Sequence, residues 1–135
     1  MLFRSPPLNG LLEIAIYVDD IARSVEFYQR VLGFETVYEG DRLSALSVPG
    51  PQVLLICQRT ASANLPVIAH HAEGRQHFAF AVTRADLDAW LGRLETLVVP
   101  IEHTRDWPRG GRSVYFRDPD GHLVELATPG VWTIY

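Results

Sequence analysis

Residues 13–18 alternate between apolar and other side chains, a pattern typical of a half-buried β-strand. One face of this strand carries Ile14, Ile16 and Val18, and the other carries Glu13, Ala15 and Tyr17. Residues 77–82 repeat the alternation, and His77 takes the place that Glu13 has in the first run. The repeat predicts that the chain contains two copies of one structural unit.

A helical pattern follows each of these strands. The first has apolar residues spaced by four, three and four positions, namely Ile21, Val25, Tyr28 and Leu32. Asp20 is its predicted N-cap and Gly33 its predicted C′ residue. The second has Leu87, Leu91, Leu94 and Val98 at the same spacing, after Thr83 and Asp86, which resemble a capping box. The matched spacing extends the repeat from strand to helix.

Three short strand-like runs come after each helix. They cover about residues 34–39, 42–48 and 52–58 in the first half, and 100–104, 112–117 and 122–127 in the second. Proline and glycine mark the last turn of both sets, at positions 49–51 and 118–121. When the last strands are aligned, Leu55 stands where Glu125 stands in the second half.

The predicted fold class is therefore α+β, with two paired βαβββ modules forming a curved mixed sheet around a cavity. We expect a single domain over 1–135, with module one at about 11–58 and module two at about 75–127. A linker (59–74) joins them and an apolar tail (128–135) follows. Each sheet has a second face that needs a partner, which is the other module of the same chain or that of a neighbouring chain. The tail also favours a homodimer.

Composition narrows the function. A chain of 135 residues suits one domain. The net charge of −4 and the absence of a basic stripe argue against nucleic acid as a partner. No run approaches the roughly 20 apolar residues of a membrane span. No secretory signal is seen, and the single cysteine, Cys57, suits a reducing compartment. We expect a soluble cytoplasmic protein that acts on a small molecule.

Four equivalent inward positions follow from the repeat, two on the opening strands and two on the closing strands. Three of them hold Glu13, His77 and Glu125, and Leu55 fills the fourth. Ionised carboxylates are rarely buried unless they are paired or bound to a metal, and these strands carry no nearby Lys or Arg. The pattern predicts that Glu13, His77 and Glu125 bind one divalent metal ion, with open positions for water or substrate.

Three segments carry a resemblance to a known family. They are residues 17–34, with Tyr17-Val18-Asp19-Asp20 and Val31-Leu32-Gly33-Phe34, then residues 77–82, then Tyr115-Phe116-Arg117-Asp118-Pro119-Asp120-Gly121 through Glu125. Over about 11–127 the chain resembles the vicinal oxygen chelate superfamily of glyoxalases, fosfomycin-resistance transferases, extradiol dioxygenases and bleomycin-resistance proteins. The resemblance implies paired modules around one metal, with ligand positions at 13, 77 and 125.

Departures from the family pattern restrict the chemistry. Glyoxalase I-like enzymes use a fourth ligand, a Glu that also moves the proton, and Leu55 would occupy its place. Extradiol dioxygenases bind Fe(II) through two His and a carboxylate, whereas Glu13 replaces one His here. Fosfomycin-type transferases share the Ser-x-Tyr that Ser113 and Tyr115 form, but they too use two His and one Glu. The resemblance therefore implies dioxygenase-like or lyase/transferase-like chemistry rather than that of a true glyoxalase I.

The ligand set also bears on the metal. Two carboxylates and one imidazole leave a divalent ion neutral, which favours Mn²⁺ or Fe²⁺ and leaves Zn²⁺ and Ni²⁺ open. By alternation Tyr17, Cys57, Ser113 and Tyr115 share the inward side, and Tyr115 is the candidate catalytic hydrogen-bond donor. Tyr17, Cys57, Ser113 and Arg112 are the candidate substrate-binding residues. Whether His70, His71 or His103 reaches the site stays open, as does a purely structural role for each of these residues.

Two hypotheses follow. The first is a metal-dependent enzyme that acts on a small molecule with two vicinal oxygens. The alternative is a metal-free protein that binds and sequesters an antibiotic, as bleomycin-resistance proteins do. The presence of Glu13, His77 and Glu125 favours the enzyme, because a sequestering pocket needs no metal ligands.

Overall fold

The computed structural model describes residues 5–135. Its elements are β1 (Glu13–Val18), α1 (Ile21–Leu32), β2 (Glu35–Glu39), β3 (Leu43–Val48), β4 (Gln52–Gln58), α2 (Arg59–Ala63), β5 (His77–Ala81), α3 (Leu87–Thr96), β6 (Ile101–Asp106), β7 (Arg112–Arg117) and β8 (Leu123–Ala127). We call β1 to β4 with α1 the first module, and β5 to β8 with α3 the second module.

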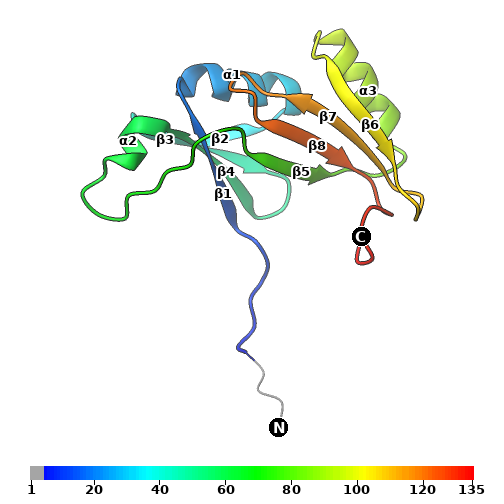
Figure 1. The fold of residues 1–135 in the computed structure, drawn as a ribbon, viewed down its shortest axis with the longest axis horizontal. Coiled ribbons are helices and arrows are strands. Elements are labelled where there is room, and N and C mark those ends of the chain that lie inside the picture. The colour runs from blue at the N-terminus through cyan, green and yellow to red at the C-terminus, as the bar shows by residue number, and fades with distance from the viewer. Residues whose placement is uncertain (1–4) are drawn as a thin grey trace.

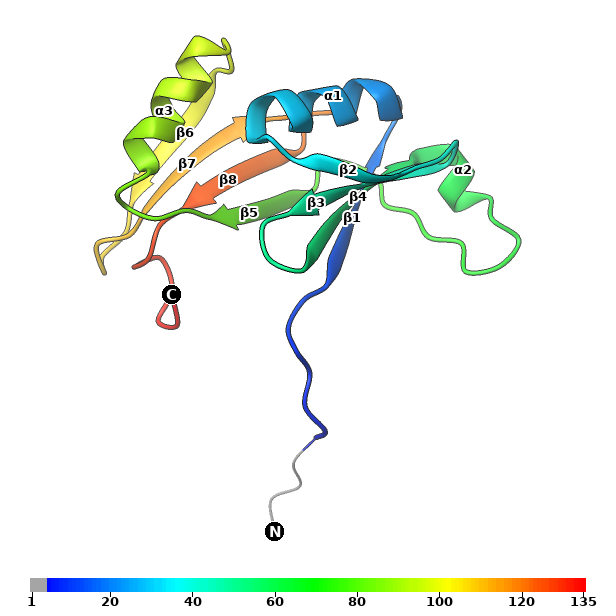
Figure 2. The same ribbon diagram turned by 180° about the vertical axis from the view of Figure 1, so that it is seen from behind.

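Each module contains a four-stranded mixed sheet, and the strand orders match. They are β1-β4-β3-β2 and β5-β8-β7-β6, with the opening strand parallel to the closing strand in both. The two sheets lie side by side as an arch, with α1 and α3 on its outer side and both ends of the described chain on the other (Figures 1 and 2). The predicted α+β fold of two βαβββ modules is confirmed.

The helix ends agree with the sequence in the first module and differ in the second. The Asp20 side chain accepts a hydrogen bond from the Arg23 backbone, and Gly33 adopts the left-handed conformation with φ of 74°. In the second module Thr83 caps only a turn, through the backbone N–H of Asp86, and α3 begins after it. The helix ends at Thr96, so Val98 leaves the predicted apolar stripe and is exposed.

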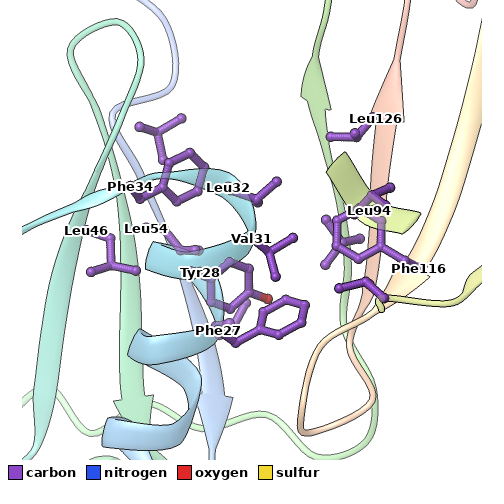
Figure 3. Packing of buried hydrophobic residues seen from close by; sticks show 14 of the residues in the cluster. Phe27, Tyr28, Val31, Leu32, Phe34, Leu46, Leu54, Leu94, Phe116 and Leu126 are labelled. Atoms are coloured by element: carbon purple, nitrogen blue, oxygen red, sulfur yellow. The ribbon is translucent and has the colours of Figure 1, made fainter. Parts of the chain in front are cut away.

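The core joins the two modules. Phe27 and Tyr28 of α1 point toward Phe116 and Leu94 of the second module, and Phe34 packs against Phe80 (Figure 3). Each of these large side chains contributes about 2 kcal/mol by leaving water. Helix α1 therefore serves both sheets, and this packing fixes one module against the other.

Polar contacts add to the junction. The Tyr28 hydroxyl donates to Asp118 Oδ2 at 2.7 Å, and Arg23 pairs with Asp120 in the same β7–β8 turn. His122 is fully buried, and its Nδ1 accepts from the Gln76 backbone. Its Nε2–H must then donate to the Tyr17 carbonyl at 2.8 Å. These bonds tie the first and last segments of the two modules together.

Within residues 5–135 no helix has the length and apolar character needed to cross a bilayer.

Candidate metal centre

The second module brings two of the three predicted ligands together. His77 opens β5, and Glu125 lies on the adjacent strand β8, beside Ala79. The imidazole Nε2 lies 3.1 Å from Glu125 Oε1. The carboxylate is buried, while half of the His77 side chain faces solvent. The pair thus sits on the face of the sheet that α3 does not cover.

The proton positions of His77 follow from its neighbours. Its Nδ1 lies 3.0 Å from the Leu123 carbonyl, which can only accept, so Nδ1 carries the hydrogen. In the neutral ring Nε2 then presents a lone pair to Glu125 Oε1, and two acceptors face each other. Such a pair needs a proton or a cation between its members. A histidine that donates its other N–H to a backbone carbonyl is the usual arrangement of a metal ligand.

The second oxygen of Glu125 is held by a directed hydrogen-bond chain. The Ser113 hydroxyl lies 2.5 Å from Oε2, and Trp107 Nε1 lies 2.9 Å from that hydroxyl. Because an indole N–H only donates, the Ser113 hydroxyl accepts a hydrogen bond from Trp107 and donates one to Glu125 Oε2. Oε2 is therefore occupied, and Oε1 remains directed at His77. This geometry favours a carboxylate that binds a metal through one oxygen.

Tyr115 and His103 extend the same face. Tyr115 pairs with Glu125 across the β7–β8 ladder, and His103 pairs with Tyr115 across β6–β7. The Tyr115 ring centroid lies 6.2 Å from that of His77 and 6.1 Å from that of His103. His103, Tyr115 and Glu125 thus form a polar row across β6, β7 and β8, and His77 lies beside its Glu125 end. His103, whose position was open from the sequence, lies next to the predicted catalytic tyrosine.

Glu13 does not join this pair within one chain. It is the exposed first residue of β1 and lies beside Val53, while Leu55 lies beside Ala15. Within residues 5–135 no three His, Cys, Asp or Glu side chains stand close enough to hold a metal. The single chain therefore brings two of the predicted ligands together on the second module and leaves the third, Glu13, apart on the first.

The predicted substrate-binding residues lie in three places. Ser113 is in the chain to Glu125 described above. Tyr17 and Cys57 are cross-strand partners in the first module, and burial raises the pKa of the Cys57 thiol despite the opposing charge of Arg42. Arg112 lies on the opposite side of β7 from Ser113 by alternation, with its Nε 3.6 Å from Asp106 Oδ1.

Trp107 is a residue that the sequence alone did not single out. It lies in the turn between β6 and β7, and the Arg105 guanidinium lies over its ring at 3.8 Å from the centroid. Strand β6 runs to Asp106 rather than ending at 104, and this brings Trp107 back over Ser113. No periodic pattern marks such a contact, because it depends on the geometry of one turn.

Comparison with known proteins gives consistent matches over most of the chain. The family model described as Glyoxalase/Bleomycin resistance protein/Dioxygenase superfamily matches residues 10–126. The metallothiol transferase FosB of Staphylococcus epidermidis is 31% identical over 122 residues, covering 90% of this chain and 84% of the relative. The fosfomycin resistance protein FosX of Listeria innocua is 31% identical over 126 residues, covering 88% and 89%.

Among solved structures, the crystal structure of lactoylglutathione lyase from Agrobacterium tumefaciens is similar with a TM-score of 0.88 and 36% sequence identity. The match covers 95% of this chain and 99% of that one. The resemblance expected from the sequence motifs is confirmed by these matches.

Proposed function

Because the chain belongs to the glyoxalase/bleomycin resistance protein/dioxygenase superfamily, we propose that it is a divalent-metal-dependent enzyme with transferase-like activity on a small molecule. The observation that carries the proposal is the facing of His77 Nε2 and Glu125 Oε1 at 3.1 Å. Every other polar atom of this pair already has a partner, so the two free lone pairs converge on the place of a cation.

The proposal includes Glu13 as the third ligand, supplied by a second copy of the chain. The two opening strands are related by the repeat, and Glu13 and His77 hold equivalent positions on open sheet faces. A homodimer that lays the first module of one protomer over the second module of its partner would cover both faces. Exposed apolar residues near the chain ends favour such a cover: Leu8, Leu11, Leu12, Trp132 and Ile134.

Each residue of the centre then has a defined task. A divalent ion at this place would act as a Lewis acid on the oxygens of the bound substrate. Glu125 offers Oε1 while Ser113 and Trp107 hold Oε2, which fixes the carboxylate plane. The Tyr115 hydroxyl stands on the same face and can donate a hydrogen bond to a substrate oxygen that gains charge. The charge argument favours Mn²⁺ or Fe²⁺ as the metal, with Zn²⁺ and Ni²⁺ as further candidates.

Transferase-like chemistry is favoured over isomerisation. Relatives named metallothiol transferase and fosfomycin resistance protein share about a third of their residues with this chain. The similar Agrobacterium structure is that of a lactoylglutathione lyase. At the fourth symmetric position, however, Leu55 has no atom that can bind a metal or accept a proton. A proton-shuttling isomerase needs such an atom, whereas an enzyme that activates an electrophile for thiol attack does not.

Metal uptake tests the proposal first. Wild-type protein should bind one equivalent of Mn²⁺, Fe²⁺, Zn²⁺ or Ni²⁺ per chain at micromolar concentration, as measured by calorimetry and by metal analysis after gel filtration. The loaded protein should then catalyse transfer of a thiol to fosfomycin, and it should leave the hemithioacetal of methylglyoxal and glutathione unchanged. No metal uptake together with tight binding of an antibiotic would contradict the proposal in favour of the sequestering alternative.

A further inference from the structure

A second polar cluster lies at the other end of β1, where the linker folds against the first module. The Tyr17 hydroxyl lies 2.7 Å from His70 Nδ1, and Arg42 Nη1 lies 3.4 Å from His70 Nε2. The same guanidinium nitrogen donates to the Ser62 hydroxyl at 3.2 Å. Residues from β1, the β2–β3 turn, α2 and the linker thus meet at one point. The metal centre described above uses none of them.

Donor and acceptor roles in this cluster have a single consistent assignment. A guanidinium can only donate, so His70 Nε2 is the acceptor of the Arg42 contact. The neutral imidazole then carries its hydrogen on Nδ1 and donates it to the Tyr17 oxygen. As a result, the phenolic hydrogen of Tyr17 is not used by His70. Arg42 and His70 therefore leave the Tyr17 O–H free to donate to a further acceptor.

The charge of the cluster identifies the kind of acceptor. Within the described residues no Asp or Glu oxygen lies within 4.0 Å of the Arg42 guanidinium, although Arg59 nearby pairs with Asp19 and Glu73. Arg42 is half-buried and has only neutral partners, so its charge is uncompensated. Burial raises the pKa of Tyr17, with Cys57 adding to the shift and Arg42 opposing it. Tyr17 therefore remains a protonated donor at neutral pH.

We propose that Arg42 and Tyr17 bind an anionic oxygen group of the substrate, such as a carboxylate, phosphate or phosphonate, and that His70 orients the Tyr17 hydroxyl toward it. The guanidinium supplies the charge and the phenol supplies a directed hydrogen bond. This inference rests on the proposed function, because Tyr17 shares the inward face of β1 with Glu13.

The distance between this cluster and the metal centre bears on the length of the substrate. Tyr17 lies four residues from Glu13 along β1, which corresponds to about 13 Å between their Cα atoms. Fosfomycin, whose phosphonate adjoins its epoxide, is too short to reach both places, so the anionic group bound at Arg42 belongs to the thiol substrate. We infer that the enzyme prefers thiols that carry an acidic group distant from the sulfur.

The tautomer of His70 gives the first test. In ¹⁵N–¹H correlation spectra of uniformly labelled metal-free protein at pH 8, the His70 ring should carry its hydrogen on Nδ1, opposite to the usual preference of free imidazole. A His70→Gln variant assigns the signals. Replacing Arg42 by Met should allow the Nε2–H form to appear. A wild-type Nε2–H tautomer would overturn the proposed orientation.

Anion binding gives the second test. Methylphosphonate and acetate, titrated separately into metal-free protein, should perturb the His70 and Tyr17 ring signals in a saturable manner. Arg42→Gln should weaken this binding about tenfold and Tyr17→Phe about threefold, as expected for loss of a charged and a neutral hydrogen bond. Arg30→Gln is the matched control, because Arg30 pairs with Glu26 on α1 and should have no effect.

The two proposals fail separately in this design. If neither anion binds, or if Arg42→Gln and Arg30→Gln behave alike, the anion site is refuted even where metal uptake is normal. If the anions bind as expected and the metal does not, the proposed enzymatic function is refuted and the anion site stands. Metal uptake by Arg42→Gln should equal that of the wild type, because Arg42 lies outside the metal centre.

Discussion

The two modules share a backbone plan and differ in the side chains on their inward faces. In the second module the row across β7 and β8 contains Ser113, Tyr115 and Glu125. The corresponding row of the first module contains Leu43, Ala45 and Leu55. This row is therefore polar in the second module and apolar in the first, where Glu13 lies on the edge strand of the sheet.

This difference teaches how a duplicated fold obtains an asymmetric site. Apolar alternation on the helix-facing side is kept in both modules, because both sheets must pack on the shared core. The inward side carries no such requirement, so the polar row of β7 and β8 need not be repeated on β3 and β4. In the proposed metal centre the first module contributes Glu13, and in the proposed anion site it contributes Arg42 and Tyr17.

The largest effect is expected from removing Glu125, the predicted ligand whose equivalent in the first module is Leu55. Glu125→Ala should lower metal affinity by more than about 100-fold, because both the ligand and the acceptor for Ser113 are lost. Leu55→Ala, at the equivalent position of the first module, should change metal affinity less than about twofold. Calorimetric titration with Mn²⁺ measures both, and equal losses would refute the asymmetry.

The next effect concerns Glu13, the one predicted ligand of the first module. Glu13→Ala should weaken metal binding by about 10- to 100-fold and leave the His77–Glu125 pair intact. The unfolding transition of the metal-free variant should match that of the wild type, since Glu13 is exposed. Unchanged metal affinity would mean that Glu13 is not a ligand.

The junction between the modules offers a test of stability. Tyr28→Phe should lower the free energy of unfolding by about 2 kcal/mol, because the buried hydroxyl donates to the Asp118 carboxylate. Burial and Asp118 raise the pKa of Tyr28 well above 10.0, so the folded state keeps the proton more strongly than the unfolded state. This contribution is complete below pH 10 and declines above it.

Urea denaturation of wild type and Tyr28→Phe at pH 7 to 11 measures this effect. The difference in unfolding free energy between the two proteins should be constant up to about pH 10 and should shrink above it. A difference that grows above pH 10 would contradict the assigned sign.

A smaller effect follows from the hydrogen bond to Glu125. Ser113→Ala should weaken metal binding about tenfold, because Glu125 Oε2 loses its donor. Ser113→Thr keeps the hydroxyl and should restore most of the affinity. If the threonine variant is as weak as the alanine variant, Ser113 acts through packing and does not position the carboxylate.

The smallest effect tests the end of that hydrogen-bond chain. Trp107→Phe removes the indole N–H and should weaken metal binding about threefold. Trp132→Phe, in the exposed tail, is the matched control and should have no effect. Indole fluorescence adds a second readout. The change in emission on metal binding should be present in Trp132→Phe and absent in Trp107→Phe.

The sequence alone predicted the parts of this picture that depend on local periodicity. Alternation placed His77 and Glu125 on inward faces, and Asp20 and Gly33 were correct helix ends. Val98 was wrongly assigned to an apolar stripe, because its backbone turns to a φ of 57° after α3. A repeat detects equivalent positions, but it does not detect where a helix stops.

Contacts that depend on long-range folding were beyond sequence reasoning. The link from Trp107 to Ser113 needs the exact path of the β6–β7 turn, and the meeting of Arg42 with His70 needs the fold of the linker. Alternation gave the face on which Glu13 lies and left open which chain covers that face. The role of all three ligands, and the division into one domain, stay predictions.

The central claim is that one metal centre contains Glu13 of one protomer and His77 with Glu125 of its partner. Its most direct test mixes the Glu13→Ala and Glu125→Ala proteins, lets their subunits exchange, and measures bound metal at a concentration where neither variant alone retains any. Random exchange should restore about a quarter of the wild-type metal content, because each mixed dimer has one intact centre. If the mixture binds no metal although mixed dimers have formed, the centre does not lie between two chains.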